Sequence, residues 1–366
     1  MSHLTCGFIG LGLIGGSVAR ALKQYIRHVK IIAFDISPQT LSLAEKEAVA
    51  DVTASGIDKK FAECDYIFLC APVKKNDANL CAVRKIMKPD CLLTDVGSVK
   101  NGIHEAVRAA GLEKNFVGGH PMAGSERVGF ANSKASLLEN AYYILTPTPE
   151  VSPEKLEHYR KLVSDMRAIP LILDYRQHDY VTAAISHLPH VIASSLVNLV
   201  RESDSPDGIM RMIAAGGFKD ITRIASSQAG MWQQICLANG ENISALLSGY
   251  IRALTSFQEK LEQKDGDALY RQFEDARIYR DSFINASSGP IKRSHSISVE
   301  IPDRSGALAH ITALLAGQGL SIKNVGITHN RESEDGVLKI EFYTEASMTM
   351  AGKILKEAGY SATVRL

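Results

Sequence analysis

A glycine-rich segment near the start of the chain, Gly10-Leu-Gly12-Leu-Ile-Gly15, constrains the fold more than any other feature. It ends an apolar, β-rich run and opens a helical pattern. In this setting the first glycine allows a tight turn, the second lets the backbone approach a pyrophosphate, and the third allows close packing of helix on strand. The segment predicts a β-α-β unit that binds a dinucleotide, with cofactor-binding residues Gly10, Gly12, Leu13, Ile14, Gly15 and Asp35.

Asp35 indicates which dinucleotide is bound. It lies at the end of the second β-rich run, 20 positions after Gly15. A carboxylate there accepts hydrogen bonds from the adenosine ribose and repels a 2′-phosphate. We therefore expect NAD rather than NADP as the cofactor.

Short β-rich runs alternate with helical patterns through the first half of the chain. Such alternation is typical of a mainly parallel sheet covered by helices on both faces, so we expect a Rossmann-type α/β domain over residues 1–174. Three serines before helical patterns, Ser37, Ser98 and Ser152, are predicted to be N-caps. The predicted strands span 5–10, 29–35, 65–71, 91–97, 115–119, 142–147 and 170–174.

The strand signals end near residue 175, and helical periodicity continues to residue 284. We expect an all-helical domain over 175–288. Its longest uncharged run, 180–200, is long enough to span a bilayer but contains seven Thr, Ser, His or Asn residues and one Pro, which favours a buried helix in a soluble bundle. The surplus of apolar residues in this region indicates burial against a second subunit, hence a homodimer.

A further domain is predicted at the carboxyl end. Residues 285–294, rich in Ser, Gly and Pro, are typical of a linker. Residues 295–366 then follow the order βαββαβ, which predicts a small ferredoxin-like domain.

Composition excludes several classes of protein. With 41 Lys and Arg against 40 Asp and Glu, the chain lacks the positive charge of a nucleic-acid binder. The six cysteines form no C-x-x-C pair and have no His at metal-ligand spacing, so we expect reduced thiols and no metal site. The first residues have neither the basic lead nor the apolar block of a secretory signal. We expect a cytoplasmic protein bound to neither nucleic acid nor membrane.

Three further motifs carry residues with catalytic or binding chemistry. In GGHPMAGSE (118–126), Pro121 holds His120 extended at the carboxyl end of a predicted strand, where ligands of such sheets bind. In SHLPH (186–190), two histidines three positions apart share one helix face. In GGFKDITRIA (216–225), Lys219, Asp220 and Arg223 lie within a helical turn, and an arginine there suits a carboxylate. Structural roles stay open for all three: a loop histidine, core histidines and a surface Arg–Asp pair.

Taken together, GFIGLGLIGGS, DVGSVK, GGHPMAGSE, SHLPH and GGFKDITRIA resemble the prephenate dehydrogenase family of bacterial tyrosine biosynthesis, over nearly all of residues 1–285. The tail beginning ISVEIPDRSGALAHITALLAGQGLSIKNVGI resembles an ACT domain, a module that commonly binds amino acids at a dimer interface. The resemblance implies NAD-dependent oxidative decarboxylation of prephenate to 4-hydroxyphenylpyruvate.

The resemblance also implies roles for individual residues. His120 matches the family's catalytic base and Ser98 the serine that orients it and the substrate hydroxyl. Arg223 matches the partner of a substrate carboxylate. The other implied substrate-binding residues are His190, Ser186, His187 and Glu126.

For the tail, the resemblance implies that L-tyrosine binds as a feedback effector. The turn at 302–307 would present backbone N–H groups at a helix N-terminus to an α-carboxylate. The implied effector-binding residues are Asp303, Gly306, Ala307 and Asn324.

Three alternatives remain. An arogenate dehydrogenase, or a cyclohexadienyl dehydrogenase that accepts both substrates, would carry the same motifs. A ligand-responsive sensor without turnover would not need His120, His190 and Arg223. A hydroxyacid or imine reductase would need a Lys or Asp acid in the helical domain.

Overall fold

The structure of the protein is a computed structural model that describes residues 4–71, 73–124, 127–285, 295–301, 306–329 and 336–365. The chain divides into two compact units, Met1–Lys264 and Asp265–Leu366, and each is described by itself. The domain boundaries at 174/175 and between 288 and 295 stay predictions. The predicted linker, 285–294, lies almost wholly outside the described residues.

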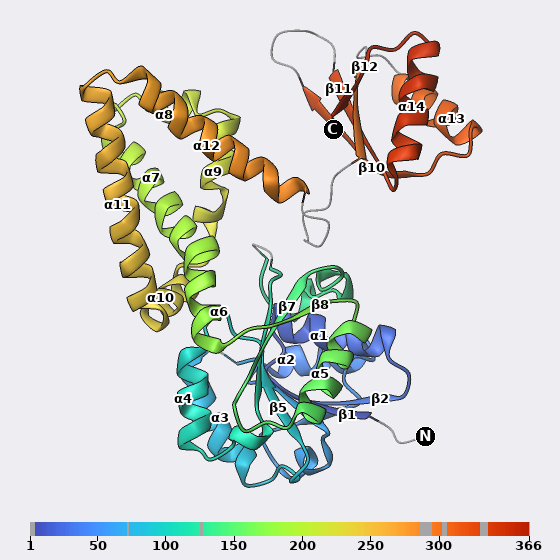
Figure 1. Ribbon diagram of the computed structural model, residues 1–366. Helices are drawn as coiled ribbons and strands as arrows, with labels where there is room; N and C mark the ends of the chain where they lie inside the picture. Colours follow the sequence, from blue (N-terminus) through green and yellow to red (C-terminus); the bar gives the residue numbers. More distant parts are fainter. Residues whose placement is uncertain are drawn as a thin grey trace. The chain divides into compact units, whose positions relative to one another are not determined.

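The first unit begins with a five-stranded parallel sheet in the order β3-β2-β1-β4-β5 (Figure 1). The order reverses beside β1, which is the topological switch point where ligands of doubly wound sheets bind. The three-residue strand β3 was not predicted, because it is too short to carry a periodic pattern. The strands are β1 (Leu4–Ile9), β2 (Val29–Phe34), β3 (Val52–Ala54), β4 (Tyr66–Leu69) and β5 (Leu92–Asp95).

Helices cover both faces of this sheet, as the sequence predicts. Successive strand residues point to opposite faces, so Phe8 and Ile9 of β1 enter different apolar clusters. One cluster includes α1 and α5, and the other includes α3 and α4. The helices are α1 (Leu13–Tyr25), α2 (Pro38–Lys46), α3 (Val73–Arg84), α4 (Asn101–Ala109) and α5 (Pro153–Asp165).

A second, three-stranded sheet has the order β6-β7-β8: β6 (Val117–Pro121), β7 (Tyr142–Pro147) and β8 (Ile169–Ile172). β7 pairs in parallel with β8 but antiparallel with β6. An isolated parallel bridge between Leu93 and Phe116 connects the start of β6 to β5. This bridge places the end of β6, where His120 lies, next to the carboxyl end of β5.

Helices follow from residue 175, as predicted. Between α6 and α7 the turn Ala183–His187 is π-helical, with Leu188 N–H donating to the Ala183 carbonyl five residues earlier. This wider turn ends two positions before Pro189, which lacks an N–H to donate. The helices of this region are α6 (Tyr175–Thr182), α7 (Leu188–Ser203), α8 (Ile209–Ile213), α9 (Gly216–Thr222), α10 (Ala229–Ala238) and α11 (Gly240–Glu262).

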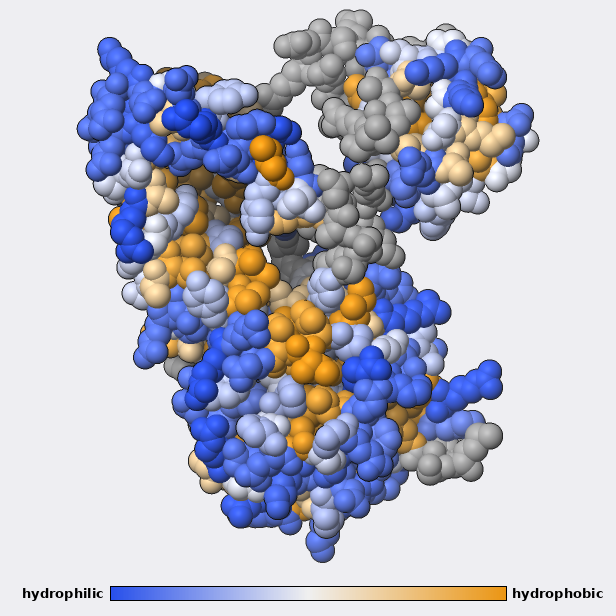
Figure 2. Space-filling model, viewed as in Figure 1, coloured by the Kyte–Doolittle hydropathy of each residue, from blue (hydrophilic) through white to orange (hydrophobic). Residues whose placement is uncertain are grey.

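Among the described residues, one helix, Tyr175–Ser203, is long enough and apolar enough to cross a membrane, judged by length and composition alone. The sequence predicts its uncharged part, 180–200, as a buried helix. In the single chain, however, only 17% of its most apolar window is buried. Ile185 and Leu199 are 63% and 60% exposed. Figure 2 shows hydrophobic residues gathered along the helical elements of this unit. The prediction of a buried helix is therefore wrong for one chain taken alone.

The second unit contains α12 (Gly266–Asn285) and a four-stranded antiparallel sheet in the order β10-β11-β9-β12. The predicted βαββαβ order is confirmed. The apolar core of the second unit joins the sheet to α13 and α14, and Ile311 of α13 and Leu355 of α14 are fully buried. The elements are β9 (His295–Ile301), α13 (Ala307–Gly317), β10 (Ile322–His329), β11 (Gly336–Phe342), α14 (Glu345–Glu357) and β12 (Ala362–Arg365).

Candidate active site

The glycine segment forms the turn between β1 and α1. Gly10 has φ +97°, and a Cβ on it would lie 2.9 Å from the backbone of Cys70 and Ala71, so only glycine fits without strain. At Gly12, by contrast, a Cβ would meet nothing within 4 Å. Gly12 directly precedes α1, and no side chain caps this helix among the described residues. The first turn of α1, with half-buried Leu13 and Ile14, thus leaves room and backbone donors for a pyrophosphate.

Asp35 follows β2 and faces the glycine turn. Its two carboxylate oxygens accept hydrogen bonds from Leu11 N–H at 2.7 Å and from Ser37 N–H at 2.8 Å. Each oxygen keeps a second lone pair for a ribose hydroxyl. The turn, the start of α1 and Asp35 therefore fit an NAD dinucleotide.

The loop between β5 and α4 is built on a buried ion pair. Lys100 and Asp95 are 0% and 1% exposed, and their side chains are hydrogen-bonded to each other. Asp95 also accepts from Gly97 N–H at 2.9 Å and Gly119 N–H at 3.1 Å, while Lys100 Nζ donates to the Gly119 carbonyl at 2.8 Å. These bonds fix the loop that carries half-buried Ser98 against the strand that carries His120.

The structure corrects the prediction that Ser98 caps α4. Lys100 precedes the helix, and the cap comes from Asp179 of α6, which lies 79 positions away. Its carboxylate accepts from Lys100 N–H and from Asn101 N–H, both at 2.8 Å. Ser37 and Ser152 do cap their helices, as predicted.

His120 lies at the end of β6 and begins a chain of hydrogen bonds. Its Nδ1 is 2.8 Å from Nε2 of His178, and Nδ1 of His178 is 2.8 Å from Oδ1 of Asp179. His178 and Asp179 are 0% and 1% exposed. Burial, together with the neighbouring His178 and Lys100, holds the pKa of His120 well below its ordinary value of 6.5, so the ring is neutral near pH 7.

The two histidines of the SHLPH motif both contact Trp232 of α10. The ring of His190 stacks on the indole with centroids 3.6 Å apart, and the ring of His187 meets it edge-on at 5.9 Å. His190 Nδ1 donates to the Ser186 carbonyl at 2.9 Å, whereas the buried His187 accepts from Asn239 through Nδ1 at 3.2 Å. Burial lowers the pKa of His187 to about 4.

Arg223 follows α9 and lies close enough to His190 for its charge to affect that ring. Burial is the main cause that lowers the pKa of His190, and the charge of Arg223 lowers it further. Lys219 and Asp220 are exposed on α9. The indole N–H of Trp232 is buried and has no hydrogen-bond partner within the described part of the chain. A hollow next to this group is lined by His190, Ser194, Ile224, Ala225, Ser227, Ala229, Trp232, Gln233 and Cys236.

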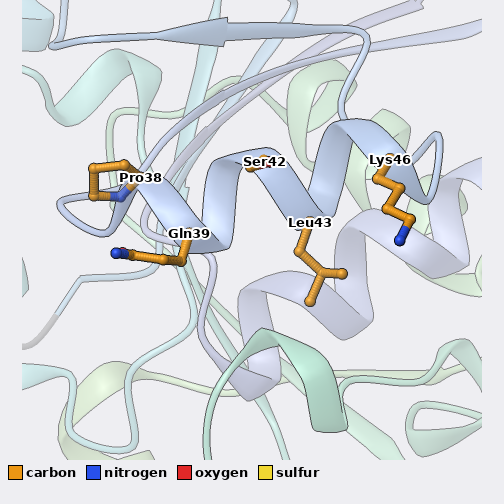
Figure 3. Close-up of a pocket in the computed structure, with 5 residues that line it drawn as sticks. All are labelled: Pro38, Gln39, Ser42, Leu43 and Lys46. Atoms are coloured by element: carbon orange, nitrogen blue, oxygen red, sulfur yellow. The ribbon is translucent and has the colours of Figure 1, made fainter.

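Two other features add nothing to the site. Glu126 lies outside the described residues. A second hollow is lined only by Pro38, Gln39, Ser42, Leu43 and Lys46, and Figure 3 shows that all five belong to the single helix α2. Among the described residues no group of three or more His, Cys, Asp or Glu could hold a metal ion.

His178 and Asp179 lie outside the motifs that predict site residues from the sequence. They form an adjacent His-Asp pair in DYRQHDYV, at the start of the helical region. One sequence signal could have identified them: two adjacent titratable residues lie in a helix that was expected to be buried. The contact of His178 with His120 spans 58 positions, and no sequence spacing predicts it.

A glycine turn that fits a dinucleotide and a half-buried histidine at the carboxyl end of a strand in the same unit indicate a nicotinamide-dependent dehydrogenase. Comparison with known proteins agrees. Residues 18–170 match the family profile "Prephenate dehydrogenase, nucleotide-binding domain", and residues 174–275 match "Prephenate dehydrogenase, dimerization domain". The chain belongs to the prephenate dehydrogenase family, and its activity is that of an NAD-dependent oxidoreductase in tyrosine biosynthesis.

Individual relatives extend over different lengths of the chain. The prephenate dehydrogenase of Bacillus subtilis is 37% identical over 92% of this chain and 91% of its own, which includes much of the second unit. The crystal structure of Aquifex aeolicus prephenate dehydrogenase with hydroxyphenyl propionate and NAD+ is 31% identical with a TM-score of 0.73, over 77% of this chain and 99% of its own. Synechocystis arogenate dehydrogenase is 26% identical with a TM-score of 0.69, over 77% and 100%.

Proposed function

We propose that this protein converts prephenate to 4-hydroxyphenylpyruvate and carbon dioxide, with His120 as the general base. The observation that carries the proposal is the position of His120: a neutral imidazole at the carboxyl end of β6, tied through Gly119 to the loop that carries Ser98. Ligands of such sheets bind at this edge. A histidine base contributes roughly 10²–10⁴-fold to a rate.

The reaction makes modest demands on the protein. Bound NAD supplies the hydride acceptor. His120 accepts the proton of the ring hydroxyl as the hydride leaves the same carbon, which becomes a carbonyl. The bond to the ring carboxylate breaks and carbon dioxide leaves. The electron pair of that bond makes the ring aromatic and gives a phenolate, which takes a proton back to form the hydroxyl of the product. Ser98 orients the hydroxyl. The remaining rate gain comes from orientation of the substrate.

The group around Trp232 suits the rest of the substrate. Arg223 provides a cation for a carboxylate, and His190 is held in place by its stacking on the indole. The indole N–H of Trp232, which has no hydrogen-bond partner among the described residues, offers a donor to a ligand oxygen. His187 and Ser186 position this group from the π-helical turn.

We propose prephenate rather than arogenate as the preferred substrate, since the B. subtilis and A. aeolicus enzymes named for prephenate are more similar to this chain than the Synechocystis arogenate enzyme. Formation of NADH with each substrate tests this. We expect a higher kcat/KM with prephenate. A higher value with arogenate would reverse the assignment, comparable values would indicate a cyclohexadienyl dehydrogenase, and no turnover with either would favour the sensor or reductase.

We also propose that residues 295–366, the part of the second unit that follows α12, are an ACT domain that binds L-tyrosine as a feedback inhibitor. Gly306 directly precedes α13 with φ +86°, and no side chain caps this helix among the described residues. Asn324 is exposed on β10 at a register shift against β11. These features suit backbone and amide contacts to an amino acid. Ala307 is buried, and Asp303 lies outside the described residues.

The active form is proposed to be a homodimer assembled through the helical elements. The match to the dimerization domain and the exposed apolar side chains of α7 and α8 support this. A second copy would cover the helix that is mostly exposed in one chain. A cytoplasmic location stays a prediction.

A further inference from the structure

We propose that His178 and Asp179 set the tautomer of His120, so that its Nε2 is the nitrogen left free to accept the substrate proton. Both act through His120 and are positioning residues. The inference rests on the proposed role of His120 as the base, and it adds two residues to which neither the sequence motifs nor the comparisons assign a role.

The contacts of Asp179 determine which atom donates and which accepts in each hydrogen bond of the chain. Backbone N–H groups of Lys100 and Asn101 donate to its Oδ1 and Oδ2, both at 2.8 Å. A backbone N–H can only donate, so both oxygens act as acceptors. The third donor to this carboxylate is therefore Nδ1–H of His178, at 2.8 Å.

The position of the hydrogen on His178 then determines the position of the hydrogen on His120. Burial lowers the pKa of His178, so the ring is neutral and carries a single N–H, at Nδ1. Its Nε2 lone pair lies 2.8 Å from Nδ1 of His120 and accepts a hydrogen bond there. His120 consequently carries its own hydrogen on Nδ1. Its Nε2 has a lone pair and is the basic nitrogen.

The same chain offsets part of the cost of protonating a buried base during the reaction. When Nε2 of His120 takes the hydroxyl proton, the ring becomes an imidazolium, and its Nδ1–H bond to His178 becomes a charge-assisted bond. The carboxylate of Asp179 lies at the far end of the chain. His178 and Asp179 are shielded from solvent, so water does not screen this stabilisation.

The test compares two variants of His178 in the full-length enzyme. His178→Phe removes the acceptor for His120, whereas the side-chain carbonyl of His178→Gln can still accept from Nδ1–H. We expect His178→Phe to lower kcat at least about tenfold with the KM values for prephenate and NAD within about twofold, and His178→Gln to recover much of the loss. His104→Gln is the matched control: His104 is also buried but bonds to Thr146, and kcat should stay near wild type.

Nitrogen NMR of histidine-labelled enzyme gives a readout that does not depend on turnover. In the wild-type protein, the His120 signals, assigned by their loss in His120→Asn, should show a protonated Nδ1 and an unprotonated Nε2. In His178→Phe we expect this preference to be lost. A wild-type His120 protonated at Nε2 would overturn the proposal even if every variant of His178 failed to fold.

The outcomes separate this inference from the proposed function. If His120→Asn abolishes turnover while His178→Phe keeps kcat within twofold of wild type, the base assignment stands and the positioning role is wrong. If His120→Asn itself turns over normally, the proposed function of His120 fails first.

Discussion

At the scale of single residues, the chemistry depends on a histidine that stays neutral at physiological pH. Burial beside His178 and Lys100 lowers the pKa of His120, which weakens it as a base in the resting enzyme but keeps it ready to accept a proton. The same site supplies an acceptor for its other nitrogen. The structure thus keeps the base unprotonated at rest and fixes which of its two nitrogens is available to accept a proton.

We predict that His120→Asn lowers kcat by at least about two orders of magnitude with little change in KM, because a general base acts mainly in the transition state. The acid limb of the wild-type kcat/KM profile should lie below pH 6.5, since protonation of the base occurs only below its lowered pKa. Steady-state kinetics across pH checks both. Turnover near wild type in the variant would remove His120 from the mechanism.

Arg223→Ala should raise the KM for prephenate at least about tenfold, because a charge-assisted contact to a carboxylate is lost. The KM for NAD should not change. Arg201→Ala provides the control, since Arg201 is an exposed arginine that pairs with Glu202. A KM for prephenate within twofold of wild type would show that Arg223 does not bind the substrate.

Asp35→Ser should raise the ratio of kcat/KM for NADP to that for NAD by about tenfold or more, because the carboxylate that repels the 2′-phosphate is gone. Asp51→Ser, which removes a carboxylate just before β3, should leave the ratio unchanged. An unmodified enzyme that already uses NADP as well as NAD would contradict this role of Asp35.

At the scale of elements, a buried ion pair holds the loop between β5 and α4 in place. The Asp95–Lys100 pair has no solvent access, and each partner also bonds to backbone groups of β6 or of the loop. An ion pair of this kind is costly to break from one side, since the remaining charge is left buried and unpaired.

Lys100→Met is therefore expected to lower the free energy of unfolding by about 3–5 kcal/mol, measured by urea denaturation. Lys88→Met is the control, because the Lys88–Asp65 pair is about one-third exposed and its loss should cost no more than about 1 kcal/mol. Asp95→Asn added to Lys100→Met should restore part of the loss. Equal effects of Lys100→Met and Lys88→Met would show that burial does not control the energetics of the loop.

Sequence patterns correctly predicted the elements that depend on interactions between residues close together in the sequence. Strands with β-rich runs, the caps at Ser37 and Ser152 and the glycine turn follow from residues adjacent in sequence. The cap of α4 and the partner of His120 both come from α6, across long sequence separations, so no periodicity or motif indicates them. The antiparallel step between β6 and β7 was missed for the same reason, since pairing direction is a tertiary property.

At the scale of the whole molecule, residues 295–366 are expected to be separable from the catalytic part. The A. aeolicus structure aligns over 99% of its own length with only 77% of this chain. Residues 295–366 also have their own sheet and their own apolar core. We therefore expect catalysis and its regulation to be divided between residues 1–288 and residues 295–366.

A chain that ends at Ser288 should keep its activity with prephenate and lose inhibition by tyrosine. Regulation requires tyrosine to favour one global state, typically by about 1–3 kcal/mol. Inhibition curves of the full-length and shortened enzymes check this, with phenylalanine as the control ligand that lacks the hydroxyl. A full-length enzyme indifferent to millimolar tyrosine, or equal potency against both chains, would rule out this role of residues 295–366.

The carboxylate of Asp179 links catalysis to the contact between the helical region and the nucleotide-binding part. It belongs to α6, at the start of the helical region, yet it caps α4 of the nucleotide-binding part and orients the ring next to His120. Any hinge motion that lifted α6 away from α4 would break the cap and misalign the base in one movement. Full activity is therefore expected to require that the helical and nucleotide-binding parts stay in contact at α6 and α4.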